Sequence, residues 1–164
     1  MKKLEGGVPR KMAILHNLRS VYNTASIFRT ADALGLNHIF LSGTTPAPID
    51  RFGRPRSDFA KVSLGAEKTV PWSYHARLHG IIYKLKKGKV EIVSLELGVL
   101  SVDYKLFRPK GDVALIVGDE TLGVPANIQK LSDAVIQIPM KGKKESLNVA
   151  VAFGVAAYRI FDRR

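Results

Sequence analysis

The sequence contains no cysteine, only one tryptophan and just 14 acidic residues in 164. Without cysteine the chain can form neither a disulfide nor a metal site with thiolate ligands, which fits a cytoplasmic protein. No run of about 18 or more residues is uniformly apolar, so we expect no membrane span. The first residues carry positive charge with no apolar stretch behind them, which argues against a secretory signal peptide.

Several common motifs of catalysis and cofactor binding are also missing. No Gly-x-Gly-x-x-Gly follows a strand-like run, so the dinucleotide-binding fingerprint is absent. Gly118–Gly123 (GDETLG) has the glycine spacing of a phosphate loop, but Val124 and Pro125 stand where Lys and Ser or Thr are needed. The sequence has no Gly-x-Ser-x-Gly nucleophile elbow either. A generic nucleotide-binding domain therefore has no support.

Two histidines raise the question of a metal site. His75 and His79 lie four residues apart in a predicted helix, a spacing that allows both side chains to share one face. The pair lacks the intervening Glu of the metalloprotease motif, and no third ligand is evident. We therefore expect no metal.

The charge balance is the most informative property of the composition. The chain has 26 Lys and Arg, which gives a net charge of +12 and a pI near 10.1. Basic domains of this size usually bind a polyanion, most commonly nucleic acid. An ordinary soluble surface and the lysine-rich composition of a thermophilic protein are the alternatives that charge alone leaves open.

Strand-like and helix-like segments alternate along the chain, which predicts an α/β fold with a mostly parallel sheet and helices on both faces. The length favours one domain over residues 1–164, without a separate RNA-binding domain. Residues 42–57 form a long loop of the kind that is often functional. We expect strands at 11–15, 38–41, 70–74, 90–95, 113–117 and 134–138. Helices are expected at 23–34, 57–64 (with Ser57 as the cap), 75–87 and 147–161.

Three stretches combine glycines or polar residues with an adjoining apolar element. In the first, Asn23 is expected to cap a helix, and Arg29 follows six residues later. The second is the GDETLG loop after an apolar strand, where Glu120 could bind a hydroxyl or an amine. The third leads from an Ile-Pro-Met segment to Ser146 and Asn148 at a helix start. Taken singly, helix capping and a surface turn explain all three.

Taken together and in this order, the stretches resemble the three motifs of the SpoU family of RNA ribose methyltransferases, in the SPOUT superfamily. The resemblance covers about residues 11 to 160. It implies a deep C-terminal trefoil knot, which general rules of chain topology would not predict. It also implies S-adenosylmethionine as the cofactor, RNA as the substrate, and a homodimer in which two subunits complete the site.

The same resemblance implies roles for individual residues. Cofactor contacts are expected from Leu95, Gly118, Ile138, Met140 and Leu147. Catalytic positions are expected at Asn23, Arg29, Glu120, Ser146 and Asn148. In the family picture Arg29 lies at the reacting ribose, and some accounts make it the base. Because a guanidinium keeps its proton far above neutral pH, binding a phosphate and stabilising negative charge suits it better.

An RNA substrate follows from the acceptor, since only ribose offers a 2′-hydroxyl. We favour tRNA over rRNA, because minimal members of the family often act on tRNA. A non-catalytic RNA-binding dimer with the same fold is the rival hypothesis. Phosphate contacts are expected from basic residues, each of which could instead be an ordinary solvated charge: Arg19, Arg51, Arg54, Arg56, Lys61, Lys141, Lys143 and Lys144.

Overall fold

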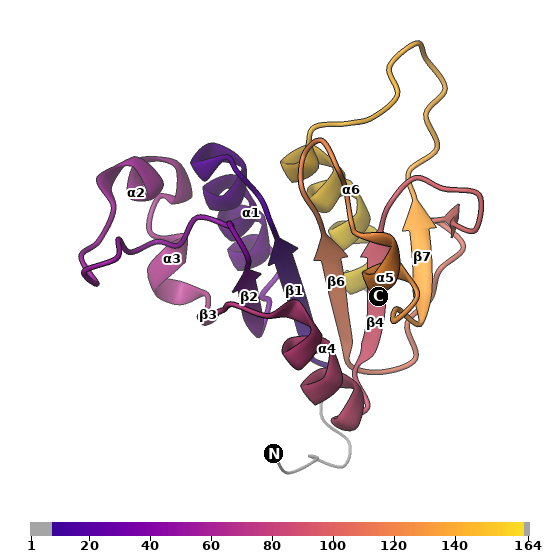
Figure 1. Cartoon of the computed structure of the whole chain (residues 1–164), viewed down its shortest axis with the longest axis horizontal. Coiled ribbons are helices and arrows are strands. Elements are labelled where there is room, and N and C mark those ends of the chain that lie inside the picture. Colours follow the sequence, from indigo (N-terminus) through magenta and orange to yellow (C-terminus); the bar gives the residue numbers. More distant parts are fainter. Residues whose placement is uncertain (1–7, 163–164) are drawn as a thin grey trace.

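The computed structural model describes residues 8–162, and within them seven strands form one sheet in which every neighbouring pair is parallel (Figure 1). The order across the sheet is β3-β2-β1-β6-β4-β7-β5. The strands are β1 (Lys11–His16), β2 (His38–Ser42), β3 (Trp72–His75), β4 (Glu91–Leu95), β5 (Val102–Asp103), β6 (Val113–Val117) and β7 (Ala134–Gln137). The predicted α/β fold with a mostly parallel sheet is confirmed.

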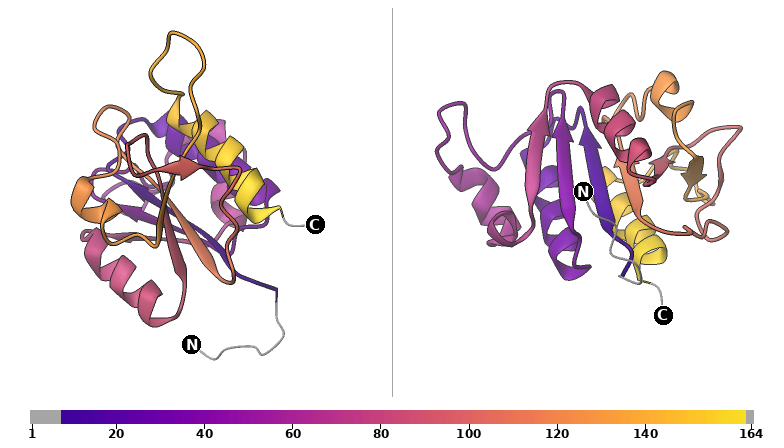
Figure 2. Two further views of the ribbon diagram at one scale, coloured as in Figure 1. Left: turned by 90° about the vertical axis from the view of Figure 1, so that its right-hand side faces the viewer. Right: turned by 90° about the horizontal axis from the view of Figure 1, so that it is seen from below.

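Helices cover both faces of the sheet, as predicted (Figure 2). One face packs against α1 (Val21–Ala33), α2 (Ser57–Ser63), α3 (Ala66–Thr69) and α6 (Val149–Phe161), and the other against α4 (Leu78–Lys87) and α5 (Ala126–Gln129). Strand β6 is apolar throughout because side chains on both of its faces are buried. Leu115 packs on the α1 and α6 side while Ile116 packs on the α4 side, so successive side chains enter different cores.

Two predicted helix caps are wrong. Helix α1 begins at Val21, and its cap is Ser20, whose Oγ accepts a hydrogen bond of 3.1 Å from the backbone N–H of Asn23. Asn23 therefore lies inside the first turn, where its side chain is free for another role. At α2 the capping position is Arg56 and not Ser57, and no side chain caps that helix.

The predicted pairing of His75 and His79 on one helix is also wrong. His75 ends β3, where it pairs in register with Ser42 of β2, and α4 begins only at Leu78. The prediction began the helix at His75, which the sheet holds in an extended conformation. Three very short elements, α3, β5 and α5, were not predicted at all.

The last helix is not buried all round in the single chain. One side of α6 enters the core through residues such as Phe153 and Ile160. The opposite side carries Val151, Val155 and Tyr158, which are 53%, 40% and 49% exposed. An apolar helix thus presents an uncovered apolar side.

The knot stays a prediction, because the strand pairings do not test it. No helix described for residues 8–162 is long and apolar enough to cross a membrane.

Candidate functional site

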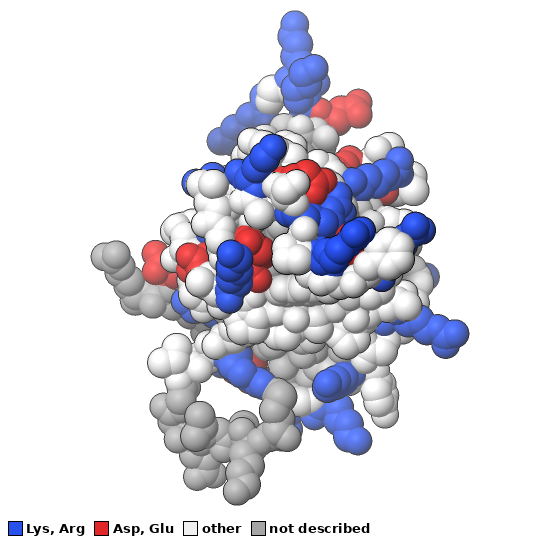
Figure 3. All heavy atoms as spheres, turned by 90° about the vertical axis from the view of Figure 1, so that its left-hand side faces the viewer, with Lys and Arg blue, Asp and Glu red and all other residues white. Residues whose placement is uncertain are grey.

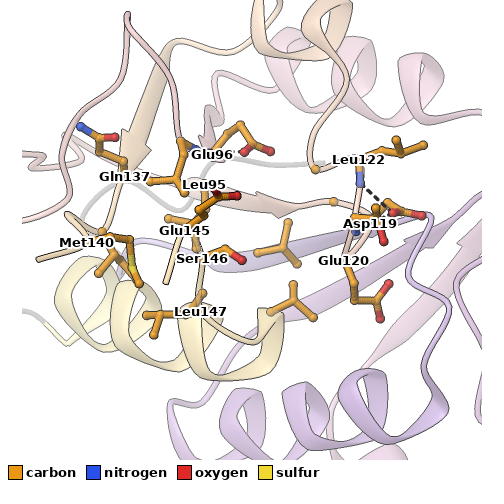
Figure 4. A pocket seen from close by; sticks show the side chains of 18 residues that line it. Leu95, Glu96, Asp119, Glu120, Leu122, Gln137, Met140, Glu145, Ser146 and Leu147 are labelled. Carbon is orange, nitrogen blue, oxygen red and sulfur yellow. Dashed lines mark hydrogen bonds between the residues drawn. The ribbon is translucent and has the colours of Figure 1, made fainter. Parts of the chain in front are cut away.

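A pocket opens where three neighbouring strands of the sheet end. It lies at the carboxyl ends of β4, β6 and β7, has a volume of about 320 Å³ and is lined by 18 residues (Figure 4). In parallel α/β sheets this is the edge at which ligands bind. The segment between β7 and α6 supplies another part of the wall and then projects away from the body of the molecule (Figure 1).

The structure places many of the predicted site residues around this pocket. Among the residues expected at the reaction centre, Glu120 and Ser146 line it. In Figure 4, Met140 and Leu147 lie on one side of the space, and Leu122 lies on the other. All five residues expected to contact the cofactor are in the lining: Leu95, Gly118, Ile138, Met140 and Leu147.

The charge of the pocket is opposite to that of the chain. Among the 18 lining residues none is Lys, Arg or His, although the chain carries 26 Lys and Arg. Four lining residues are acidic: Glu96, Asp119, Glu120 and Glu145. A lining that contains carboxylates and no cationic side chain favours a cationic ligand. The pocket is therefore suited to a positively charged molecule, and the phosphates of RNA would be repelled from it.

The loop after β6 is closed so tightly that two of its glycines are structurally required. A Cβ atom on Gly118 would lie 2.2 Å from the backbone oxygen of Gly123, and Gly123 has a φ of +68°. Asp119 Oδ1 accepts hydrogen bonds from the N–H groups of Thr121 (2.7 Å) and Leu122 (2.8 Å). These bonds lower the pKa of Asp119, with the Leu122 amide as the largest cause. The glycines thus serve loop closure as well as ligand access.

Glu120 points from this loop to the start of α1. Its carboxylate accepts hydrogen bonds from the backbone N–H groups of Arg19 (3.1 Å) and Ser20 (3.2 Å) and from Asn23 Nδ2 (3.1 Å). Partial burial raises the pKa of Glu120, but these hydrogen bonds outweigh burial and hold the pKa below its ordinary value. Glu120 is therefore an ionised acceptor that fixes the N-terminus of α1 to the pocket loop.

Asn23 and Asn148 extend the same network to the last helix. Asn148 Nδ2 donates to Asn23 Oδ1 at 3.1 Å, across 125 residues of sequence. The other end of the Asn148 side chain accepts from the N–H groups of Ala150 (2.9 Å) and Val151 (3.3 Å), which caps α6. Capping is thus a correct interpretation of Asn148, and the same side chain also joins two motifs. Neither Asn23 nor Asn148 lines the pocket.

The two arginines near the first motif have different surroundings. Arg19 donates from Nε to Asp119 Oδ2 at 2.7 Å, although its side chain is 62% exposed. Arg29 lies on the exposed side of α1, does not line the pocket, and forms no ion pair within residues 8–162. Its guanidinium is therefore available to a group outside this chain. The pocket of a single chain contains no contribution from Arg29.

The other predicted basic residues form two groups, and none of them lines the pocket. Lys141, Lys143 and Lys144 are exposed on the projecting segment between β7 and α6. On the loop before α2, Arg54 pairs with Asp50 and Arg56 with Asp58. Lysine and arginine side chains on this face alternate with acidic ones (Figure 3). The remaining predicted positions, Arg51 and Lys61, are exposed on the same loop and on α2.

Glu96 was missed by the sequence analysis. It follows β4, lines the pocket, and accepts a hydrogen bond of 2.6 Å at Oε2 from the N–H of Val124. A Cβ atom on Gly123 would lie 2.0 Å from the same oxygen, so Glu96 occupies the space that this glycine leaves. Its position in the sequence could have indicated this role. Glu96 is a carboxylate directly after a predicted strand, and Glu120 lies at a similar position after β6. Glu96 braces the far end of the β6 loop.

Comparison with known proteins identifies the family. A model of the SpoU rRNA Methylase family matches residues 11–158. The chain belongs to this family. The 23S rRNA (guanosine-2′-O-)-methyltransferase RlmB of Coxiella burnetii is 31% identical over 166 residues, which cover 100% of this chain and 62% of the relative. The chain spans roughly three fifths of the length of the curated relatives it matches.

Solved structures agree with this assignment. An AdoMet-bound rRNA methyltransferase from Sinorhizobium meliloti has a TM-score of 0.83 and 27% identity, and the match covers 96% of this chain and 59% of that one. The TrmH/SpoU tRNA modifying enzyme of A. aeolicus has a TM-score of 0.80 and 25% identity, with 92% and 73% covered. The family expected from the three motifs is confirmed, and so is the predicted α/β fold with a mostly parallel sheet.

We predict that Glu96→Ala lowers the free energy of unfolding by about 1–3 kcal/mol, because it leaves the amide of the buried Val124 without an acceptor. Urea unfolding followed by circular dichroism measures this. Glu96→Gln keeps a carbonyl acceptor and should recover most of the loss. Glu145→Ala, at another acidic lining position, should change stability by less than about 0.5 kcal/mol. Equal losses for Glu96→Ala and Glu145→Ala would contradict the bracing role.

Proposed function

We propose that this chain transfers a methyl group from S-adenosylmethionine to the 2′-hydroxyl of a ribose in RNA. The observation that carries the proposal is the meeting of three distant motifs, through Asn23, Glu120 and Asn148, beside one acid-lined pocket. Membership of the SpoU family and a relative named as a guanosine-2′-O-methyltransferase support the same activity.

The pocket suits this cofactor in charge and in composition. S-adenosylmethionine has a sulfonium and an amino group, and the carboxylates of the lining favour such a cation. Leu95, Ile138 and Leu147 would contact its apolar parts, and the volume of about 320 Å³ lies in the range of small-molecule sites. When bound, the cofactor supplies an electrophilic methyl group. The residues present therefore fit the group that the family implies.

What the chain itself contributes is chiefly positioning. In the proposed reaction the S–CH₃ bond breaks, an O–CH₃ bond forms at the ribose 2′-oxygen, and the hydroxyl proton passes to water. Glu120 and Asn148 hold the N-termini of α1 and α6 beside the pocket, so that the acceptor and the methyl group can be aligned. Ser146, exposed in the lining, offers a hydroxyl to the ribose or the cofactor.

Arg29 is the residue we assign to the reacting ribose. A guanidinium keeps its proton at neutral pH, so it is a poor base, but it can bind the adjacent phosphate and stabilise negative charge on the 2′-oxygen. The pocket itself offers no positive group for this purpose. The anchoring role therefore fits the structure better than the role of a base.

A homodimer accounts for the position of Arg29 and for the uncovered side of α6. Val151, Val155 and Tyr158 form an exposed apolar strip on α6, and α1, which carries Arg29, is its neighbour in the same layer (Figure 1). A second copy packed on this side would bury the strip. It would also bring Arg29 of one chain toward the pocket of the other.

The relatives reported above differ in the class of RNA for which they are named. RlmB of Coxiella burnetii is named for 23S rRNA and the Sinorhizobium meliloti structure for rRNA, whereas the A. aeolicus structure is named for tRNA. The preference for tRNA stated from the sequence thus loses its support. We propose rRNA as the first substrate pool to test and tRNA as the second.

We predict that the parent chain converts labelled S-adenosylmethionine and unmodified RNA into a 2′-O-methylated nucleoside, identified by mass spectrometry. Arg29→Ala should lower the rate by roughly 100-fold or more, with little change in cofactor affinity by calorimetry. Arg29→Lys keeps the charge and should retain part of the rate. A methylated base would overturn the ribose chemistry. No product together with no cofactor binding would favour the RNA-binding dimer.

A separate prediction concerns the dimer. Val155→Asp places a charge in the apolar strip of α6 and should shift the protein from dimer to monomer in sedimentation velocity, with loss of methyl transfer. Tyr83→Asp is the matched control, because Tyr83 is 73% exposed on α4, on the opposite face of the sheet. It should remain dimeric and active. A monomeric parent, or a dimeric and active Val155→Asp, would refute this arrangement.

A further inference from the structure

The loop between β2 and α2 contains a compact turn over residues 48–56. Ile49 and Pro55 form an antiparallel bridge, and the N–H of Asp50 donates to the backbone oxygen of Arg54 at 2.8 Å. The turn closes at Gly53, whose φ of +79° favours glycine. A second backbone bond of 2.9 Å, between residues 56 and 48, joins its two ends. The turn is therefore a built element within a long loop.

A single carboxylate organises the tip of this turn. Asp50 Oδ1 accepts hydrogen bonds from the N–H groups of Phe52 (2.8 Å) and Arg54 (3.0 Å), and Oδ2 accepts from Arg54 Nε at 2.8 Å. These bonds, led by the one from the Arg54 backbone, keep the pKa of Asp50 below its ordinary value. Backbone and side chain are thus fixed before any partner binds, which reduces the entropy lost on binding.

The fixed tip presents an aromatic ring to solvent. Phe52 is 66% exposed and belongs to neither hydrophobic core. The guanidinium carbons of Arg51 and Arg54 lie 4.7 Å and 5.0 Å from the centre of its ring. An exposed phenyl ring with two guanidinium groups near it contributes nothing to either core, but this combination of groups stacks on nucleobases.

The charges of the loop favour stacking over phosphate binding. Arg54 is already paired with Asp50 and Arg56 with Asp58, so two of the three arginines in the turn are partly neutralised. What remains prominent is the ring of Phe52 with the Arg51 guanidinium beside it. A groove for duplex backbone would need unpaired cations, whereas an aromatic platform suits bases that are unstacked from a helix.

We propose that Phe52, with Arg51, stacks on an unpaired base of the RNA substrate. The proposal rests on the proposed function for the existence of an RNA substrate and adds where a single-stranded part of that RNA binds. The turn follows β2, whereas the pocket lies at β4, β6 and β7, beyond β1 in the sheet (Figure 1). The stacked base is therefore a different nucleotide from the one methylated in the pocket of the same chain.

The experiment measures the affinity of the full chain for poly(U) and for a poly(A)·poly(U) duplex over a series of salt concentrations. Phe52→Ala should weaken poly(U) binding by about 5- to 100-fold at every salt concentration, because stacking releases no counterions. Phe52→Tyr keeps a ring and should bind like the parent. Arg51→Ala removes a stacking group and a charge together, so it should weaken poly(U) binding and also lower the slope of log affinity against log salt by about one. Duplex binding should be unaffected by Phe52→Ala.

Three outcomes would overturn the proposal. The first is that Phe52→Ala binds poly(U) with the affinity of the parent, which would favour a protein partner for the ring. The second is that Phe52→Ala changes the slope of log affinity against log salt. The third is that Phe52→Ala lowers the affinities for the duplex and for poly(U) equally. Cofactor affinity should persist in Phe52→Ala, and methyl transfer by the parent tests the proposed function separately, so a failure of stacking alone leaves the proposed function intact. A parent that neither binds nor methylates RNA would remove both.

Discussion

The hydrogen bonds between Glu120, Asn23 and Asn148 are the constraint on which the arrangement of the site depends. They join the loop after β6, the first turn of α1 and the first turn of α6, three segments that lie far apart in the chain. Glu120 and Asn148 also accept hydrogen bonds from backbone N–H groups at the starts of α1 and α6, where such groups have no partner within the helix. One network therefore stabilises two helix starts and sets the shape of the pocket edge. The three motifs of the family form one structural unit.

The distribution of charge complements this network. A chain with a net charge of +12 keeps Lys and Arg out of the pocket lining and gathers four carboxylates there. In the proposed function, such a separation would draw RNA to the outer surface and the cationic cofactor to the pocket. The cation proposed to act at the ribose, Arg29, lies outside the pocket on the surface of α1. In the proposed homodimer, Arg29 of the second chain would supply the positive charge at the reaction centre.

The sequence predicts the long elements well because their patterns are strong. Val113–Val117 reads as a buried parallel strand since all five residues enter one core or the other, and the three motifs give the family and the residues near the pocket. The two-residue strand β5 and the four-residue helices α3 and α5 are too short to show a period. Ser20 and Asn23 are both good capping residues, and the choice between them depends on a contact with Glu120 about 100 residues away. The bracing role of Glu96 likewise depends on its hydrogen bond to the amide of Val124, 28 residues away, which forms only when the loop after β6 is folded.

The most direct test of the account is a double-mutant cycle on cofactor affinity. S-adenosylmethionine is titrated calorimetrically into the parent, Glu120→Ala, Asn148→Ala and the double variant. If Asn23 couples the two residues into one support for the pocket, each single change weakens binding and the double change costs less than their sum, by about 0.5–3 kcal/mol. Effects that add within about 0.5 kcal/mol, or a parent that binds no cofactor, would contradict the account.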